Sequence, residues 1–376
     1  MTSAASRGEG ELAAIAADPA LRRSYAAARR LNAEHGRTYY LATLLLPAWK
    51  RPYVHALYGF ARYADDIVDS LDSQLSAAER AAWLADWGGR LVEALRQGTI
   101  TVGKPDSTDG APAVVFPGGT GSGAADARGA GRTVPGEAGS GHAICDRAGS
   151  RGGYDAVARP LYQSEVSVLP AVIHAIRRWD IPVGHFEAFL ASMAMDLTVA
   201  GYDTFEDLMG YVYGSGTVIG LQMLPVLEPG SAAAAPYAGD LGTAFQLINF
   251  LRDVGEDLRR GRVYLPRESM ELFGVSRERL ATGVVDGAVR RLLRHEIGRA
   301  REILHGATPG IRLLHPTSRD CVHTAARLYG GILDEIEKAG YQVLDRRVAV
   351  GTPRRLAVAG GALLRVQGRR LASWQR

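Results

Sequence analysis

Two acidic clusters of the same form lie far apart in this chain of 376 residues. The first runs from Asp65 to Asp69 with the sequence DDIVD, and the second runs from Asp253 to Asp257 with the sequence DVGED. Both lie in stretches with helical spacing, where residues four apart share a face, so each cluster points two carboxylates in one direction. Carboxylates crowded in this way repel one another unless a cation lies between them. The pattern predicts a helical fold in which these two faces bind cations.

The chemistry of the two clusters indicates the kind of ligand they hold. Their side chains offer oxygen atoms and no Cys or His, which suits Mg²⁺. This ion keeps several waters and completes its shell with phosphate oxygens of a substrate. Two such faces opposed across a helical cavity would hold a diphosphate on metal ions.

Composition excludes several other classes of protein. The chain is 47% hydrophobic, which is ample for one large core or at most two domains. Its two cysteines, Cys145 and Cys321, exclude a disulfide scaffold and fit a reducing compartment, and no Cys and His cluster would hold zinc. The N-terminus lacks the apolar core of a secretory signal, and no apolar run is long enough to span a bilayer. We therefore expect a cytoplasmic protein.

Helical spacing of apolar residues covers almost the whole chain outside one segment. Strand-like alternation is missing, so we predict an all-α fold. The helices are expected at residues 24–36, 51–71, 77–98, 185–201, 244–261, 288–306 and 321–341. The exception, residues 101–153, is rich in Gly and poor in large apolar residues, which predicts a disordered insertion. The helices on either side carry the two halves of one site, so we expect a single domain at residues 20–350.

Residues 351–376 are predicted to form a basic tail. The formal charge of the chain is only +4, but no acidic residue follows Asp345. The arginines beyond that point are Arg346, Arg347, Arg354, Arg355, Arg365, Arg369, Arg370 and Arg376. With the apolar sequence LAVAGGALL among them, the tail is either a solvated terminal helix or a peripheral contact with anionic membrane lipid. Elsewhere basic residues are mostly interleaved with acidic ones, which argues against nucleic-acid binding.

A polar stripe follows the helix of the first cluster. Tyr58, Arg62, Asp65 and Asp69 succeed one another at steps of four, three and four, and Asp66 lies beside them. Apolar residues surround the stripe, so burying it would be expensive unless it binds something. Taken alone, the stripe is explained equally well by a surface helix with an Arg-Asp pair.

A similar stripe follows the helix of the second cluster. Its members are Gln246, Asn249, Arg252, Asp253, Glu256 and Asp257. Buried amides and acids at this spacing need partners. The arginines that follow, Arg259, Arg260 and Arg262, would cover released pyrophosphate. Because a similar carboxylate layout recurs on two distant helices, an ordinary charged face explains it poorly.

Two further stretches carry weaker signals. His35, Arg37 and Thr38 would provide donors to a phosphate, although a polar helix start is the simpler explanation. The sequence YGSGTVIG contains the small residues Gly214, Ser215, Gly216 and Gly220. They would let an apolar chain lie against the helix backbone, or they mark close packing of helices, which is the commoner case.

Five segments occur in an order that resembles squalene and phytoene synthases. They are HGRTYYLATLLLP, ALYGFARYADDIVD, MDLTVAGYDTFEDLMGYVYG, QLINFLRDVGEDLRRGRVYLP and LYGGILDEIEKAGYQVLDRR. The resemblance covers nearly the whole chain apart from the insertion and the two ends, and the fourth segment looks most like bacterial phytoene synthases. It implies a single all-α isoprenoid-synthase domain with a central cavity and two opposed Asp-rich helices. Such a domain condenses two prenyl diphosphates head to head with Mg²⁺.

The resemblance also implies roles for individual residues. The implied metal ligands are Asp65, Asp66, Asp69, Asn249, Asp253, Glu256 and Asp257. The residues implied to bind the substrate diphosphates are His35, Arg37, Thr38, Gln246, Asn249, Arg252, Tyr329 and Arg347. The residues implied at the reacting centre are Tyr58, Arg62, Tyr211 and Tyr264.

The sequence departs from the family pattern in three places. The usual Ser-x-Ser becomes Gly36-Arg37-Thr38, which loses one hydroxyl. The usual Val-Ala-Gly becomes Ser215-Gly216-Thr217, which bears on selectivity for chain length. The Gly-rich insertion replaces a short connection.

The leading hypothesis is that the enzyme, a prenyltransferase, makes phytoene from two geranylgeranyl diphosphates for carotenoid biosynthesis. The reaction would pass through a cyclopropyl diphosphate, would use Mg²⁺ or Mn²⁺ without NADPH, and would hand its product to a phytoene desaturase. Squalene or dehydrosqualene synthesis from farnesyl diphosphate is the alternative with the same chemistry. A non-catalytic isoprenoid-binding or assembly protein is the alternative from another class. A non-catalytic relative would be expected to lose some of Asp65, Asp69, Asp253 and Asp257, and all four are present.

Overall fold

The computed structural model describes residues 4–69, 75–97, 167–348, 350–351, 357–358 and 360–363. Within these ranges the protein is built from helices and has no strand, only two isolated backbone bridges, Gly201 with Val263 and Pro229 with Leu314. The predicted all-α fold is therefore confirmed. The predicted insertion, residues 101–153, lies outside the described residues, as does most of the predicted tail.

The helices of the described residues follow one another as listed here. They are α1 (Ala4–Ala17), α2 (Pro19–His35), α3 (Arg37–Thr43), α4 (Arg51–Asp69), α5 (Ala77–Gln97), α7 (Leu169–Trp179), α8 (Gly184–Met195), α9 (Phe205–Val212), the π-helix η1 (Tyr213–Thr217), α10 (Val218–Met223), the 3₁₀ turn η2 (Pro225–Leu227), α11 (Ala234–Arg259), α12 (Arg267–Leu272), α13 (Arg277–Ala281), α14 (Gly287–Ala307), the 3₁₀ turn η3 (Thr308–Leu313) and α15 (Pro316–Lys338).

Local sequence explains where several of these helices begin. Asp18 caps α2 by accepting hydrogen bonds from two backbone N–H groups, and proline occupies the first helical position. Thr204 and Asp207 form a reciprocal capping box at the start of α9. Asp286 caps α14 in the same way as Asp18 caps α2. These short polar side chains satisfy donors that a helix start leaves unpaired.

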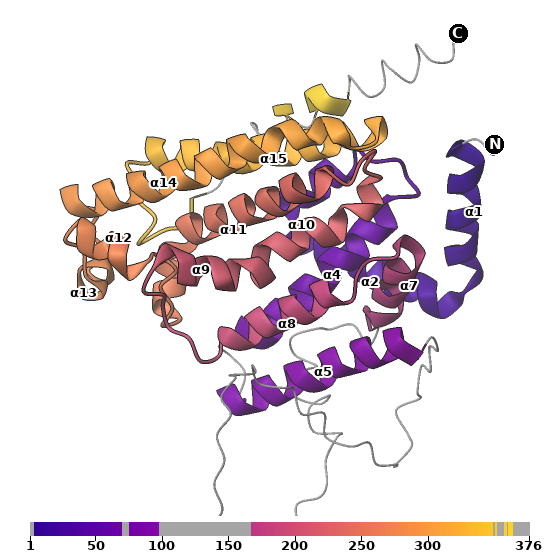
Figure 1. Cartoon of the computed structure of the whole chain (residues 1–376), viewed down its shortest axis with the longest axis horizontal. Helices are drawn as coiled ribbons and strands as arrows, with labels where there is room; N and C mark the ends of the chain where they lie inside the picture. Colours follow the sequence, from indigo (N-terminus) through magenta and orange to yellow (C-terminus); the bar gives the residue numbers. More distant parts are fainter. Residues whose placement is uncertain are drawn as a thin grey trace, which may run out of the picture.

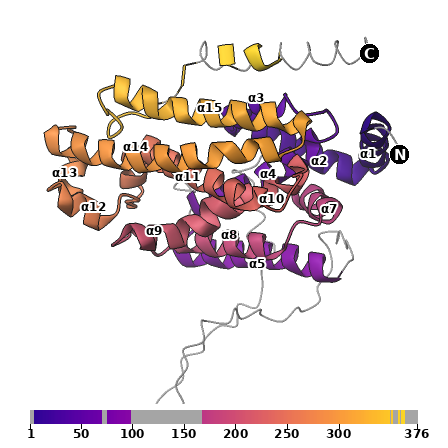
Figure 2. The ribbon, with the colours of Figure 1, turned by 45° about the horizontal axis from the view of Figure 1, so that its top comes forward.

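The helix α11 runs through the middle of the molecule (Figure 1). It packs against α14 and α15 on one side and against α10 and the π-helix on the other. The helix α4 packs against α2 and α7, so the helices that carry the two acidic clusters belong to one bundle. Figure 2 shows α1 at one end of this bundle and α12 with α13 at the opposite end.

Glycines allow α10 and the π-helix to approach α11 closely. A Cβ atom on Gly220 would lie 1.9 Å from the carbonyl oxygen of Ala238, and one on Gly242 would lie 2.3 Å from that of Gly216. No side chain larger than hydrogen fits at such distances. Gly214 faces α8 in the same manner, 2.1 Å from Ser192 Oγ. Close helix packing is thus the reason for these small residues.

No helix in the described part of the chain is both long and apolar enough to cross a membrane. The described part of the tail does not lie free in solvent. Ala362 is completely buried, and Val358 and Leu363 pack against the core. This short apolar segment therefore lies against the bundle, and the arginines from Arg365 onwards lie outside the described residues.

Candidate active site

One large cavity, with a volume of about 880 Å³, lies between α2, α3, α4, the π-helix, α10, α11 and α15. Ligand pockets span roughly 300–1,000 Å³, so this cavity is at the large end of that range. Acidic and basic side chains from α4 and the C-terminal half of α11 line one part of it. The apolar part of the lining includes Leu46, Val54, Leu57, Met223, Leu241 and Ile332. The cavity therefore suits a ligand with a charged head and a long apolar tail.

Arg62 lies between two carboxylates of the first cluster. Its Nη1 atom donates to Asp65 Oδ2 at 3.0 Å, and its other terminal nitrogen pairs with Asp66. Asp65 lines the cavity, with 45% of its side chain exposed. Asp66 is only 13% exposed and is not among the cavity-lining residues. Of this pair, only Asp65 is placed to meet a ligand.

The third carboxylate of the first cluster is held from a distant part of the chain. Arg260 Nη1 donates to Asp69 Oδ2 at 2.9 Å, and Arg262 pairs with the other carboxylate oxygen. Both arginines follow the second acidic cluster in sequence, so their ion pairs join the end of α11 to the end of α4. The two clusters lie opposite one another, as the sequence predicts.

Arginines also bind the second cluster. Asp253 pairs with its neighbour Arg252 and with Arg347, whose Nε lies 2.8 Å from Asp253 Oδ1. Glu256 pairs with Arg260 at 2.8 Å. The cluster is thus tied to the segment that follows α15, which carries Arg347. Arg347 is 56% exposed, in contrast to the buried arginine pairs at Asp69.

Two carboxylates in the cavity experience too little positive charge. Desolvation together with the charge of Asp69 raises the pKa of Asp65 to about 7, in spite of Arg62. Desolvation together with Asp253 and Asp69 raises the pKa of Asp257 to about 8, against the effect of the nearby arginines. A carboxyl whose pKa is raised by burial and like charge gains from an added cation. One such group lies on each helix.

The residues present fit Mg²⁺ together with a phosphate ligand. Among the described residues, no three His, Cys, Asp or Glu side chains converge closely enough to hold a metal by themselves. Mg²⁺ commonly takes only one or two carboxylates and fills its remaining positions with water and substrate phosphate. The Oδ1 atom of Asn249 is buried without a hydrogen-bond partner, while its Nδ2 donates to Gln246 Oε1 at 3.3 Å. This amide oxygen adds a ligand of the required type beside Asp253.

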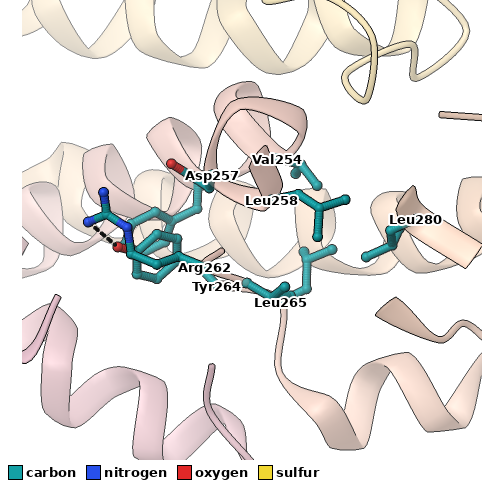
Figure 3. A pocket seen from close by; sticks show the side chains of 9 residues that line it. Val254, Asp257, Leu258, Arg262, Tyr264, Leu265 and Leu280 are labelled. Carbon is teal, nitrogen blue, oxygen red and sulfur yellow. Dashed lines mark hydrogen bonds between the residues drawn. The ribbon is translucent and has the colours of Figure 1, made fainter. Parts of the chain in front are cut away.

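Two tyrosines share a carboxylate that the sequence analysis did not select. Tyr211 and Tyr264 each donate a hydrogen bond of 2.7 Å to Asp196, one to each oxygen. Arg262 Nη1 lies 3.4 Å from the same carboxylate and 3.3 Å from the Tyr264 hydroxyl (Figure 3). Asp196 is 6% exposed and lines the cavity. It was missed because it stands alone after α8, without a second acid at helical spacing.

A second, much smaller pocket lies beside this group. Figure 3 shows Asp257 and Arg262 on one side of it and Leu258, Leu265 and Leu280 on the other. Its volume is about 10 Å³, close to the minimum for a single water molecule. It is too small for a substrate.

The remaining predicted residues surround the large cavity. Tyr329 is buried and stacks on Phe245, with ring centroids 4.1 Å apart. His35 and Arg37 are exposed, which places the opening of the cavity beside them. The other predicted residues that line it are Thr38, Tyr58, Arg62, Tyr211, Gln246, Asn249, Arg252, Glu256, Tyr264 and Arg347. The structure thus brings the predicted set together around one cavity, with Asp66 as the exception.

The small-residue helix serves the cavity as well as helix packing. Ser215, Gly216 and Gly220 line the cavity, although packing against α11 is what requires glycine at positions 216 and 220. The π-helix displaces the backbone after Tyr211, and Ser192 Oγ donates to the freed Tyr211 carbonyl at 2.9 Å. Single π-helical turns within helices occur frequently at functional sites.

Comparison with known proteins agrees with this geometry. The squalene/phytoene synthase family profile matches residues 32–117 and 126–354. The chain belongs to this family. It is 31% identical to a 15-cis-phytoene synthase of Synechocystis, over 92% of this chain and 86% of that protein. It is 30% identical to a phytoene synthase of Arthrospira platensis, over 92% and 94% of the two chains.

Solved structures of the squalene/phytoene synthase family share the fold. A dehydrosqualene synthase superposes with a TM-score of 0.68 at 21% identity, covering 92% of this chain and 98% of that one. The squalene synthase HpnC from Alicyclobacillus acidocaldarius superposes with a TM-score of 0.61 at 20% identity, covering 85% and 95%. At these identities the likeness establishes the isoprenoid-synthase fold and nothing finer.

Proposed function

We propose that the protein is a phytoene synthase that joins two molecules of geranylgeranyl diphosphate head to head. The observation that carries the proposal is the single cavity, which combines two opposed acid clusters with a long apolar lining. A diphosphate head fits the charged part, and a prenyl tail fits the apolar part. The curated relatives named phytoene synthase support this product over a shorter one.

The charged end of the cavity would bind both diphosphates. Asp65 and Asp69 on one side, with Asp253, Asp257 and Asn249 on the other, would hold Mg²⁺. When bound, Mg²⁺ supplies Lewis-acid neutralisation of the leaving pyrophosphate. The arginines now paired with these carboxylates would turn to the phosphate oxygens, where guanidinium groups bind in a bidentate manner. His35, Arg37 and Thr38 would contact the head group at the opening.

The apolar part of the cavity would protect the cations formed on the prenyl chains. Loss of the first pyrophosphate leaves an allylic cation, and the double bond of the second molecule attacks it. Loss of a proton then closes a cyclopropane that keeps the second diphosphate. Loss of that diphosphate, rearrangement and loss of another proton give phytoene. Because water would quench these cations, its exclusion by the lining is essential.

Aromatic rings would stabilise the same cations. Tyr264 stacks on Phe250 with ring centroids 4.1 Å apart, and Tyr211 lies 5.5 Å from Tyr264. All three rings line the cavity, so their negative faces are available to a cation. This places the reacting carbons between the acid clusters and the apolar part of the lining.

One incubation tests the proposal against its alternatives. The purified protein is given Mg²⁺ and either geranylgeranyl or farnesyl diphosphate, and the hydrocarbons are separated by chromatography. We expect phytoene from geranylgeranyl diphosphate without NADPH. A product from farnesyl diphosphate alone would make the protein a squalene-type synthase, and turnover of neither substrate would favour a binding protein. Asp253→Asn is the matched inactive control.

We also propose peripheral contact with a membrane, because the product has no polar group and should leave into lipid. The arginines available for anionic lipid are Arg365, Arg369, Arg370 and Arg376. The protein should sediment with anionic vesicles at low salt and be released as salt screens the charges. A variant with these arginines replaced by glutamine should lose vesicle binding but keep turnover in detergent. Delivery of the product to a desaturase would then occur in the membrane.

A further inference from the structure

Asp196 contradicts a local rule of helix structure. It follows directly after α8, and its backbone caps the C-terminal end of that helix. The C-terminal end of a helix carries partial negative charge, so an acidic side chain there is unfavourable. Asp196 is also 94% buried, where an ionised carboxylate needs strong compensation. A residue that opposes both local preferences is expected to be retained for function.

The partners of Asp196 indicate that function. Its two oxygens accept hydrogen bonds from the hydroxyls of Tyr211 and Tyr264, both at 2.7 Å. Tyr211 comes from α9 and Tyr264 from the segment after α11, so neither hydroxyl is fixed by its own helix. Both rings line the cavity beside Phe250, and Tyr202 lies 5.4 Å from Tyr211. One carboxylate thus sets the directions of two hydroxyls from different elements.

Arg262 extends this arrangement to the first acid cluster. Its guanidinium lies 3.4 Å from Asp196 and pairs at the same time with Asp69. Removing the charge of Asp196 would leave the two tyrosine hydroxyls without their common acceptor and Arg262 with one partner fewer. The carboxylate itself is covered by these three side chains and would not touch a prenyl chain.

We propose that Asp196 is the positioning residue that fixes Tyr211 and Tyr264 at the centre where the prenyl chains react. The inference rests on the proposed function for the identity of the substrate. With both hydroxyls donating to Asp196, the ring faces and the hydroxyl oxygens point in fixed directions around the cations. Misplaced catalytic groups slow a reaction strongly even when the substrate binds normally.

Turnover measurements on Asp196→Asn test this role. We expect kcat to fall about a hundredfold, with KM and the Mg²⁺-dependent Kd for inorganic pyrophosphate within about twofold of the wild type. The cyclopropyl diphosphate should also form a larger share of the products. In a Tyr211→Phe, Tyr264→Phe background the same substitution should have little further effect, because its targets are gone. Full additivity, or a change confined to pyrophosphate affinity, would overturn the proposal.

A matched control and a structural readout complete the experiment. Asp203→Asn lies a few residues further along, is 69% exposed and pairs only at the surface with Arg267, so it should leave every value unchanged. In protein labelled with 3-fluorotyrosine, the ¹⁹F resonances assigned to Tyr211 and Tyr264 should move in Asp196→Asn and stay in place in Asp203→Asn. Unmoved resonances would refute the positioning role whatever the substrate is.

The readouts separate the inference from the proposed function. If the wild type turns over only farnesyl diphosphate, the proposed substrate fails while the kinetic test proceeds on that substrate. If Asp196→Asn does not fold, Tyr211→Phe and Tyr264→Phe replace it, since each removes one of the two hydrogen bonds. Their losses in kcat should then be clearly non-additive, and simple additivity would count against a shared acceptor.

Discussion

The acid clusters of α4 and α11 have almost the same spacing but are neutralised in different ways. Asp69 on α4 is held by Arg260 and Arg262, which belong to a distant part of the chain and are 23% and 11% exposed. Asp253 on α11 is held by its neighbour Arg252 and by Arg347, which is 56% exposed. The first cluster is thus fixed by a buried clamp and the second by a more open one. We infer that similar sequence patterns can give sites of unequal rigidity.

The largest effect is expected where the two clusters should behave alike. Asp69→Ala and Asp253→Ala should each lower turnover about a thousandfold or more, because each removes a metal ligand that stabilises the leaving diphosphate. Helical circular dichroism should be unchanged in both. Turnover is measured at saturating Mg²⁺ with a prenyl diphosphate. Near wild-type activity in either variant would disprove the metal assignment for that cluster.

The arginines should reveal the difference between the clusters. Arg262→Gln should lower the free energy of unfolding by about 3 kcal/mol, because it leaves buried Asp69 and Asp196 with fewer partners. Arg347→Gln should lower it by less than about 1 kcal/mol, as expected for an exposed pair. Urea denaturation of the metal-free protein measures both. Equal losses would mean that the two clamps do not differ as the exposed fractions indicate.

Packing around the two helices should differ in the same direction. Gly242→Ala on α11 should destabilise the protein by about 2–3 kcal/mol, because its Cβ would lie 2.3 Å from a backbone oxygen. Gly59→Ala on α4 meets Ala28 at 3.2 Å and should lower stability by about 1 kcal/mol. Gly298→Ala on α14 has open space around it and should raise stability by about 0.5–1 kcal/mol. Thermal unfolding ranks the three, and any other order contradicts this account.

The contrast also shows which features a sequence pattern can reveal. The stripes on α4 and α11 were predictable because spacings of three and four residues are local properties of a helix. The sequence placed Arg260 and Arg262 near released pyrophosphate, but it could not indicate that they pair with Asp69, far away in the chain. The helix α11 begins ten residues before the predicted start, at Ala234 instead of residue 244, because that stretch has small residues in place of apolar periodicity.

Asp196 marks the limit of pattern analysis more clearly. Its partners, Tyr211 and Tyr264, were both selected by family resemblance, yet the acid that holds them carries no motif of its own. Only the meeting of α8, α9 and the segment after α11 brings them together. Residues that act through tertiary contacts alone are therefore the part of this site that the sequence leaves out.

The smallest expected effect concerns the pH dependence of stability in the metal-free protein. The pKa of Asp65 is raised to about 7 and that of Asp257 to about 8, above the values in the unfolded chain. Between about pH 4 and these values the folded protein binds more protons than the unfolded chain, so its stability falls as pH rises. The melting temperature should drop by a few degrees between pH 6.5 and 9, at about 2 °C per kcal/mol.

Single substitutions assign this pH dependence to the two clusters. Asp257→Asn should remove more of the drop than Asp65→Asn, because the Asp65 side chain is 45% exposed and solvent screens its charge. Mg²⁺ with inorganic pyrophosphate should abolish the drop in the wild type by compensating both carboxylates. The pKa of buried His55 is lowered to about 4, so that group destabilises the fold only below about pH 6.5, outside this window. A melting temperature that rises from pH 6.5 to 9 would show that neither carboxylate lacks compensation.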